Sequence, residues 1–203
     1  MIYVVNNRIA FKYAILLFNL IIIIYYISDL TCLKLLNKIS FKRRKITMKK
    51  FELTNKSITV NGVKLYRIKS LINFGDVKAG DLGGYVEKED NLSHEGNAWV
   101  FGDAWVFGDA QVFGNAWVYD NAWVYGNARV YGNVQVFDNA RVYGDAQVFG
   151  EAWVYDNARV YGDTRVFNNT CVFGNAQVFG NAHVYGNAHV YGNERVYNDV
   201  PCV

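Results

Sequence analysis

Proline, cysteine and histidine are scarce in this chain of 203 residues, which contains one proline, three cysteines and three histidines. The cysteines, Cys32, Cys171 and Cys202, are odd in number and far apart, which excludes a disulfide framework and the paired spacing of a zinc site. We therefore expect no metal site and no bound cofactor. A single proline at this length is compatible with one compact domain or one elongated repeat domain.

Lysine is missing from the second half of the chain, because all 12 lysines precede residue 96. Residues 1–47 carry eight Lys or Arg and one acidic residue, and residues 48–95 carry eight basic and seven acidic residues. Residues 96–203 carry five arginines and ten Asp or Glu, so this region has a net charge of −5. The absence of a basic stripe argues against a nucleic acid as the partner.

These differences divide the chain into a leader (1–47), a middle segment (48–95) and a repeat region (96–203). The leader contains Tyr13–Ser28, sixteen residues without a charge, which we expect to form a hydrophobic helical segment. A helix of that length spans about 24 Å, whereas the hydrocarbon core of a bilayer is about 30 Å thick. The segment can anchor the protein in a membrane if the bilayer thins or the flanking residues snorkel.

A second interpretation of the leader is that it is translated from upstream DNA. It has no glycine, and most of its residues belong to the set that AT-rich codons encode. Met48 then opens a run that is typical of the start of a soluble protein. We expect a cytoplasmic protein if translation starts at Met48, and a membrane-anchored one if residues 1–47 are retained.

Residues 48–95 are predicted to form a small N-terminal β cap. Asn61 and Gly62 separate two apolar-rich runs, a position in which Asn-Gly is typical of a β-hairpin with a type I′ turn. Gly84, Asp90 and Gly96 are six residues apart, so we expect the repeat register to begin before the obvious repeats. The acidic residues of this segment, together with its one histidine, are interpreted as turn-forming or solvated side chains rather than metal ligands.

Seventeen consecutive hexads run from Gly96 to Tyr197 without an insertion. Their consensus is Gly/Asp–Asn/Asp–Ala–x–Val–Phe/Tyr, with valine in every fifth place. A period of six contains three periods of two, so alanine and valine share one face of a short strand. The x position includes five arginines, which could not all be paired in an interior. Alanine and valine therefore point inward, and x and the aromatic residue point outward.

This pattern resembles the hexapeptide-repeat, left-handed parallel β-helix family, in which an aliphatic residue is followed four places later by a small one. Val100 with Ala104, and Val106 with Ala110, follow that spacing, although Phe or Tyr stands where the family usually has glycine. Residues 73–100 also resemble the opening of bacterial and phage-encoded hexapeptide-repeat proteins that have a small N-terminal β element, with which no established activity is associated.

The resemblance implies three hexads per coil, so residues eighteen apart stack on one another. We expect an all-β fold: a single-stranded left-handed parallel β-helix of about six triangular coils, with a small N-terminal β-hairpin cap and a hydrophobic N-terminal helical segment.

The outward aromatic residues are the main candidates for a binding surface. Stacked rings also stabilise a sheet, by about 0.2–1 kcal/mol per pair, so a purely structural role is the alternative. Most tryptophans lie in the first two coils, where the predicted binding surface comprises Trp99, Trp105, Trp117, Trp123, Phe101, Phe107, Tyr119 and Tyr125. We expect a non-catalytic scaffold or interaction protein that binds a protein or carbohydrate surface. A carbohydrate-binding module is one alternative.

An acyltransferase-like enzyme is the other alternative, because many hexapeptide-repeat proteins are acyltransferases. In those enzymes a histidine usually acts as the general base between subunits of a trimer, so this alternative also implies a homo-oligomer. His183 and His189 are the only candidates in the repeats, and we expect both to be surface residues without a carboxylate partner. No loop is inserted between the hexads to complete an active site, so we assign no catalytic residue.

Overall fold

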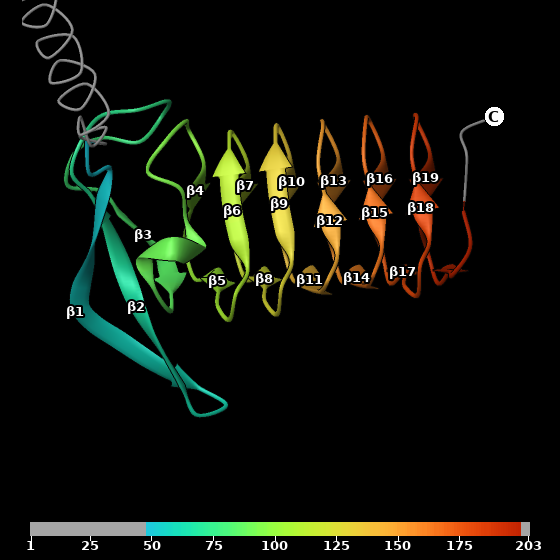
Figure 1. Ribbon diagram of the computed structural model, residues 1–203, viewed down its shortest axis with the longest axis horizontal. Coiled ribbons are helices and arrows are strands. Elements are labelled where there is room, and N and C mark those ends of the chain that lie inside the picture. The colour runs from blue at the N-terminus through green and yellow to red at the C-terminus, as the bar shows by residue number, and fades with distance from the viewer. Residues whose placement is uncertain (1–47, 200–203) are drawn as a thin grey trace, which may run out of the picture. The chain divides into compact units, whose positions relative to one another are not determined.

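The computed structural model describes residues 48–199, which form twenty β-strands and one short 3₁₀ helix, η1 (Glu89–Asn91) (Figure 1). The predicted leader, with its Tyr13–Ser28 segment, lies outside these residues. Among residues 48–199 there is no helix with the length and apolar character needed to cross a membrane. The prediction of an all-β fold is confirmed for this region.

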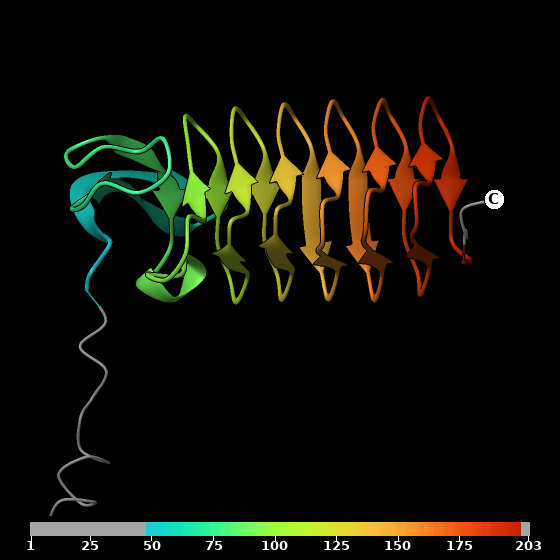
Figure 2. The ribbon, with the colours of Figure 1, turned by 90° about the horizontal axis from the view of Figure 1, so that it is seen from above.

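The repeats form a parallel β-solenoid of about six turns, in which three sheets run along the axis (Figures 1 and 2). The long sheet has nine strands: β1 (Phe51–Val60), β2 (Val63–Ser70), β3 (Leu82–Val86), β5 (Trp105–Val106), β8 (Trp123–Val124), β11 (Arg141–Gly144), β14 (Arg159–Gly162), β17 (Gln177–Val178) and β20 (Arg195–Val196). The six-stranded sheet contains β4 (Trp99–Val100), β7 (Trp117–Val118), β10 (Gln135–Val136), β13 (Trp153–Val154), β16 (Cys171–Val172) and β19 (His189–Val190). The five-stranded sheet contains β6 (Gln111–Gly114), β9 (Arg129–Gly132), β12 (Gln147–Val148), β15 (Arg165–Val166) and β18 (His183–Val184).

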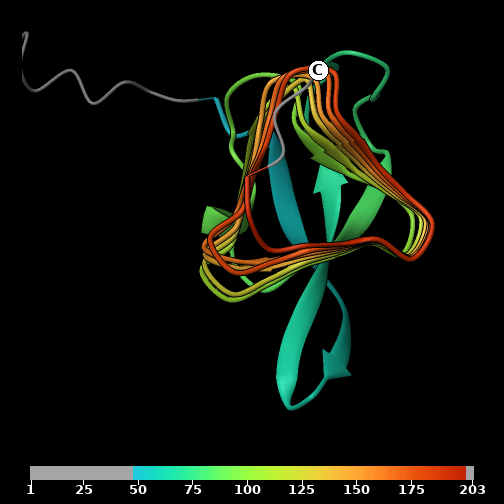
Figure 3. The same cartoon turned by 90° about the vertical axis from the view of Figure 1, so that its right-hand side faces the viewer.

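Residues eighteen apart pair with each other in all three sheets, as the resemblance to the hexapeptide-repeat family implies. Trp117, for example, lies between Trp99 and Gln135 in the six-stranded sheet. The backbone N–H of Trp117 donates to the carbonyl of Val134 at 2.9 Å, and the same bond recurs from coil to coil. Viewed along the axis, the coils superpose as a stack of three-sided turns (Figure 3).

The interior of the solenoid is filled by alanine and valine. Ala146 and Val148 are fully buried, as are almost all of their counterparts in the other hexads. Thr164 and Thr170 replace alanine at two inward positions and are buried too. The predicted division between inward and outward residues is therefore confirmed.

Most corners of the coils require glycine, because the backbone has positive φ and the next coil approaches closely. A Cβ added to Gly132 would lie 2.7 Å from the carbonyl oxygen of Gly150. The corner at Gly102, the first of its row, is roomier, since a Cβ there would meet nothing nearer than 3.6 Å in the next coil. The following residues of that row include Asp120 and Asp138, which keep the positive φ, at 58° and 56°.

The middle segment extends the long sheet at its N-terminal edge. Strands β1 and β2 form an antiparallel hairpin whose turn residues, Asn61 and Gly62, have φ of 50° and 83°. Both values are positive, as a type I′ turn needs. Strand β2 pairs with β3, and β3 pairs in parallel with β5 of the first coil. In Figure 3 the hairpin, coloured cyan to teal, projects past one side of the coils.

The six-residue spacing extends back before Gly96, as expected, since Val86 and Leu92 pair with Val106 and Val112. The frame is not continuous with Gly96, however, because two additional residues precede Val100. Leu92 bridges to Val112, twenty residues away, whereas Val100 pairs with Val118, eighteen residues away. The two additional residues lie between Leu92 and Val100. His94 lies in this irregular stretch, and its Nδ1 accepts a hydrogen bond from the backbone N–H of Lys50 at 3.1 Å.

Each coil donates its N–H groups to the coil that follows, so the carbonyl groups of the first coil need donors from residues 48–95. On the long sheet these are backbone groups, such as the N–H of Tyr85, which donates to the carbonyl of Ala104 at 2.9 Å. On the six-stranded sheet, the amine of Lys50 takes the place of the missing donors. Its Nζ lies 2.8 Å from the carbonyl oxygen of Ala98 and 3.3 Å from that of Gly96. Burial lowers the pKa of Lys50 to about 8.

Asn91 performs the same task beside the five-stranded sheet. Its side-chain Nδ2 donates to the carbonyls of Gly108 and Ala110, at 3.0 and 2.8 Å, and the residue is fully buried. A buried carbonyl that loses its donor costs about 1–3 kcal/mol. The junction between the middle segment and the coils therefore depends on buried side-chain donors.

Replacing Asn91 with alanine is expected to lower the free energy of unfolding by about 2–4 kcal/mol, because two buried carbonyls lose their donor. Urea unfolding followed by circular dichroism measures the change. The matched control is Asn139→Ala, which removes only an exposed bond to Asn157. That control should alter stability by less than about 0.5 kcal/mol. Equal effects of the two substitutions would contradict the role of Asn91.

Candidate functional site

Trp99 does not belong to an exposed binding surface, contrary to the prediction. Its side chain is fully buried. Phe74 and Phe51 of the middle segment pack against its ring, with centroids 5.3 and 6.2 Å away. The outward position of Trp99 in its hexad is thus covered by the chain that precedes the repeats, which the hexad pattern could not show.

The aromatic residues in the sixth place of the hexads form three ladders along the outside of the solenoid. The first contains Phe101, Tyr119, Phe137, Tyr155, Phe173 and Tyr191, and the second contains Phe107, Tyr125, Tyr143, Tyr161, Phe179 and Tyr197. The third contains Phe113, Tyr131, Phe149, Phe167 and Tyr185. Most neighbouring rings are nearly parallel: Tyr125 and Tyr143, for example, have centroids 4.8 Å apart and planes 3° apart.

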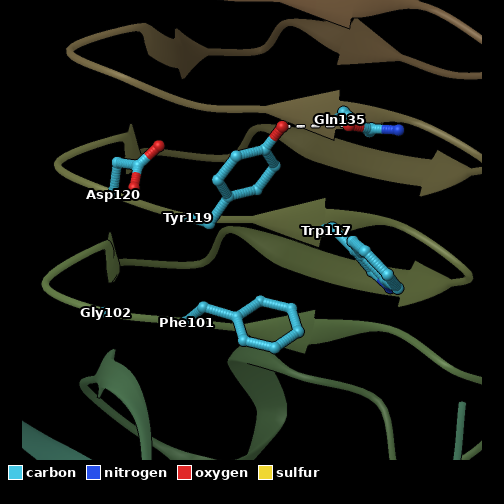
Figure 4. A pocket seen from close by; sticks show the side chains of 6 residues that line it. All are labelled: Phe101, Gly102, Trp117, Tyr119, Asp120 and Gln135. Atoms are coloured by element: carbon cyan, nitrogen blue, oxygen red, sulfur yellow. Dashed lines mark hydrogen bonds between the residues drawn. The ribbon is translucent and has the colours of Figure 1, made fainter. Parts of the chain in front are cut away.

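A cavity of about 400 Å³ opens beside the first ladder, on the six-stranded sheet (Figure 4). It is lined by Phe101, Gly102, Trp117, Tyr119, Asp120 and Gln135. Trp117 and Tyr119 come from one hexad, two residues apart, so they point to the same outer side. Phe101 is supplied by the preceding coil and Gln135 by the following one. The cavity unites three of the predicted surface residues: Phe101, Trp117 and Tyr119.

The hydroxyl of Tyr119 is held by the neighbouring coil. It donates to the side-chain oxygen of Gln135 at 2.9 Å, as Figure 4 shows. Burial raises the pKa of Tyr119 to about 12, with smaller contributions from the carboxylates of Asp120 and Asp138. The phenol therefore stays neutral at physiological pH and acts as a hydrogen-bond donor and a stacking surface.

A second cavity, of about 410 Å³, lies on the long sheet. It is lined by Ile58, Tyr85, Asp103, Trp105, Asn121 and Trp123. Here the two indoles are stacked on each other, with centroids 4.6 Å apart and planes 19° apart. The guanidinium of Arg141 lies over the ring of Trp123, 4.3 Å from its centroid. One face of Trp123 is thus covered by Trp105, and Arg141 adds a cation–π contact.

The predicted surface residues therefore do not form one patch. Trp105 and Trp123 line the second cavity, while Phe107 and Tyr125 line neither of the two cavities. The rings of Phe107 and Tyr125 stack in the second ladder with centroids 5.0 Å apart. Their position is consistent with the structural alternative, in which ring stacking supports the sheet.

Sequence reasoning missed two polar residues of the first cavity, Asp120 and Gln135. The eighteen-residue stacking places Gln135 directly after Trp117, so its neighbourhood was predictable. Asp120 stands at a corner where most hexads have glycine. This replacement of glycine by aspartate was the sequence signal that could have pointed to it. In the second cavity, Tyr85 pairs with Trp105 at a separation of twenty residues, which the hexad period could not predict.

His183 has a carboxylate partner, contrary to the prediction. Its Nδ1 lies 3.6 Å from Oδ1 of Asp199, which also accepts the backbone N–H of His183 at 2.9 Å. The hexads did not indicate this pair because Asp199 follows the last full hexad. His189 is exposed, and its ring meets the edge of Phe173 at 6.5 Å. Neither histidine lines the two aromatic cavities.

Several acidic residues of the middle segment have structural partners. Glu87 accepts the backbone N–H of Gly108 at 2.7 Å, and Asp81 accepts that of Lys78 at 2.8 Å. Glu89 forms an ion pair with Lys49. Within residues 48–199, the structure contains no group of three His, Cys, Asp or Glu side chains placed to hold a metal ion.

The parallel pairing of the coils in three sheets and its eighteen-residue register define a β-solenoid repeat protein. The family model described as the YdcK beta solenoid repeat matches five segments, residues 110–126, 122–136, 134–150, 152–168 and 176–198. The chain is therefore similar to that family across most of its hexads. The matched segments include Trp117, Tyr119, Asp120 and Gln135 of the first cavity. No curated protein matches the chain.

The raised pKa of Tyr119 has a measurable consequence. The folded protein keeps this phenol proton between pH 10 and 12, where the unfolded chain, with a pKa of about 10, loses it. Tyr119 therefore contributes stability below pH 10 that is lost as the pH rises to 12. We expect the difference in absorbance at 295 nm between the native protein and Tyr119→Phe to have its midpoint near pH 12.

The Asp120→Asn/Asp138→Asn double variant provides the comparison for this titration. Its midpoint should fall but remain above 10, because burial is the largest cause of the shift. Circular dichroism at each pH confirms that the protein is folded. A native midpoint of 10 would contradict the burial of Tyr119.

Proposed function

We propose that the protein is a non-catalytic β-solenoid interaction protein that presents outward aromatic side chains to a ligand. The observation that carries this proposal is the cavity at Phe101, Trp117 and Tyr119, in which three aromatic side chains from two coils line one opening. Apolar cavities with a few convergent polar groups are the usual form of a binding site. The rigid coils hold these side chains in place before a ligand arrives, which lowers the entropy cost of binding.

We also propose that the coils are those of the hexapeptide-repeat class, wound in the left-handed sense, and that residues 48–95 are a cap. The six-residue period and the spacing of aliphatic and small residues support the first part. The bonds from Lys50 and Asn91 to carbonyls of the first coil support the second.

A ligand panel measured by saturation-transfer NMR tests the interaction function. The panel contains neutral oligosaccharides, uronic acids, proline-rich and aromatic peptides, and acyl-coenzyme A. We expect at least one class to bind the native protein and to lose its signal in Trp117→Ala. The matched control is Trp153→Ala, two coils further along the same sheet and outside the cavity. If no class distinguishes these two variants, the cavity is not a binding site.

An acyltransferase acting as a trimer is the second candidate, favoured by the contact between His183 and Asp199. A carboxylate within about 4 Å orients an imidazole and supports its use as a general base. Both side chains are exposed, at 41% and 61%, so this arrangement requires a partner subunit to shield the site.

Sedimentation equilibrium of the full chain, combined with an assay for thiol release from acyl-coenzyme A, separates the two functions. The interaction protein we propose should release no thiol. An acyltransferase would form a stable trimer and, with an alcohol or amine acceptor supplied to take the acyl group, release coenzyme A. This activity would be lost in His183→Ala but kept in His189→Ala. The latter variant is the control because His189 lies on a different sheet.

A further inference from the structure

The aromatic ladders leave one stacking position empty. Within residues 48–199, Phe101 and Tyr119 are the only neighbours along a ladder whose rings are not in contact. One face of Tyr119 is stacked on Phe137, with centroids 4.8 Å apart and planes 2° apart. The ring that should cover its other face has turned away.

Phe101 leaves the ladder because it packs against two indoles. Its ring meets Trp117 edge to face at 5.4 Å and 65°, and Trp99 at 6.5 Å and 82°. Trp99 is in turn buried against Phe74 of the middle segment, on the outer side of the first coil. The empty stacking position next to Tyr119, called the vacancy below, therefore results from packing between the middle segment and the first coil. The cavity of about 400 Å³ lies at this position.

The vacancy differs from the second cavity in what it offers a ligand. At the second cavity, Trp105 and Trp123 cover each other and Arg141 lies over Trp123. At the vacancy, the face of Tyr119 that would meet the preceding ring in a regular ladder is open to the cavity. A flat ring can stack there and continue the ladder.

The polar groups around the vacancy are an acceptor and a donor. Asp120 and Trp117 flank Tyr119 on opposite sides in Figure 4. Gln135 uses its oxygen to accept the Tyr119 hydroxyl, which leaves its amide NH₂ as a donor. Rings with hydroxyl groups on their edge and C–H groups on their face match these features.

The carboxylate of Asp120 is available to a ligand, unlike those of the aspartates that follow it in the same row. Asp138 accepts the backbone N–H of Asp156 at 3.4 Å, and Asp156 accepts that of Gly174 at 3.0 Å. Among the described residues, no hydrogen bond occupies the Asp120 carboxylate, and the residue is exposed. It can accept hydroxyl protons, and its charge repels an anionic ligand.

We propose that this cavity binds one neutral pyranose ring of a carbohydrate, stacked on the open face of Tyr119, with its hydroxyls bonded to Asp120 and Gln135. This assignment rests on the interaction function proposed above and specifies its ligand. The contact involves a single ring on an open cavity, so the dissociation constant for a simple glycoside is on the order of 1 mM.

The test uses the full chain and the methyl glycosides of glucose, galactose and mannose, with methyl glucuronide as the anionic probe and tetraproline as the peptide probe. Binding is measured by saturation-transfer NMR titration. We expect at least one neutral glycoside to bind, and Tyr119→Leu to abolish its signal. Tyr155→Leu, two coils along the same ladder, is the matched control and should retain binding. The glucuronide should bind about tenfold more weakly than its neutral parent, which corresponds to 1.4 kcal/mol.

A second pair of variants guards against loss of the fold. Asp120→Gly restores the residue found at Gly102 in the same row of corners, so the backbone accepts it without strain. It should weaken glycoside binding about tenfold, because a hydrogen bond to a charged acceptor is lost. Asp138→Gly makes the same exchange one coil further and should leave binding unchanged.

The remaining outcomes separate this assignment from the interaction function. Equal binding of the glucuronide, or binding of the neutral glycoside that survives both Tyr119→Leu and Asp120→Gly, overturns the carbohydrate assignment. Tetraproline binding that depends on Tyr119 also overturns it but leaves the interaction function standing. If no probe responds to Tyr119→Leu, and the Trp117 and Trp153 variants behave alike with every ligand class, both proposals fail.

Discussion

The hydrogen bond from each backbone N–H to the carbonyl of the coil that follows is the interaction on which the rest of the structure depends. In the long sheet, for example, the N–H of Arg141 donates to the carbonyl of Ala158 at 2.9 Å. Such bonds hold neighbouring strands about 4.8 Å apart. The stacked rings repeat at nearly the same distance, 4.8 Å for Tyr125 and Tyr143. The ladders therefore follow from the backbone pairing and add stability to it.

The same pairing separates the interior from the surface in a way that suits a binding protein. The coils are narrow, and their inward positions admit only alanine, valine and threonine through most of the solenoid. The outward x position tolerates Trp, Arg, Gln, His and Cys on the same backbone. A change of surface chemistry therefore leaves the core unaltered, as the succession of Trp117 and Gln135 on one sheet illustrates.

The candidate site arises where this regularity ends. The first coil lacks a preceding coil, and the middle segment supplies donors from Lys50 and Asn91 in its place. The same segment buries Trp99, and Phe101 then packs against that indole instead of Tyr119. The cavity beside Tyr119 is thus a consequence of how the solenoid begins, and regular coils further along retain their stacked rings.

The sequence by itself determined the repeat and the inward direction of alanine and valine, while its resemblance to the hexapeptide-repeat family implied three hexads per coil and hence the rows on which the outward residues stack. It could do so because a strict six-residue period leaves one way to bury the small apolar residues. Only the tertiary structure decided that Trp99 is buried and that Phe101 leaves its ladder to pack against it. These features depend on packing between the coils and residues 48–95, which do not share the period and lie far from their partners in the chain.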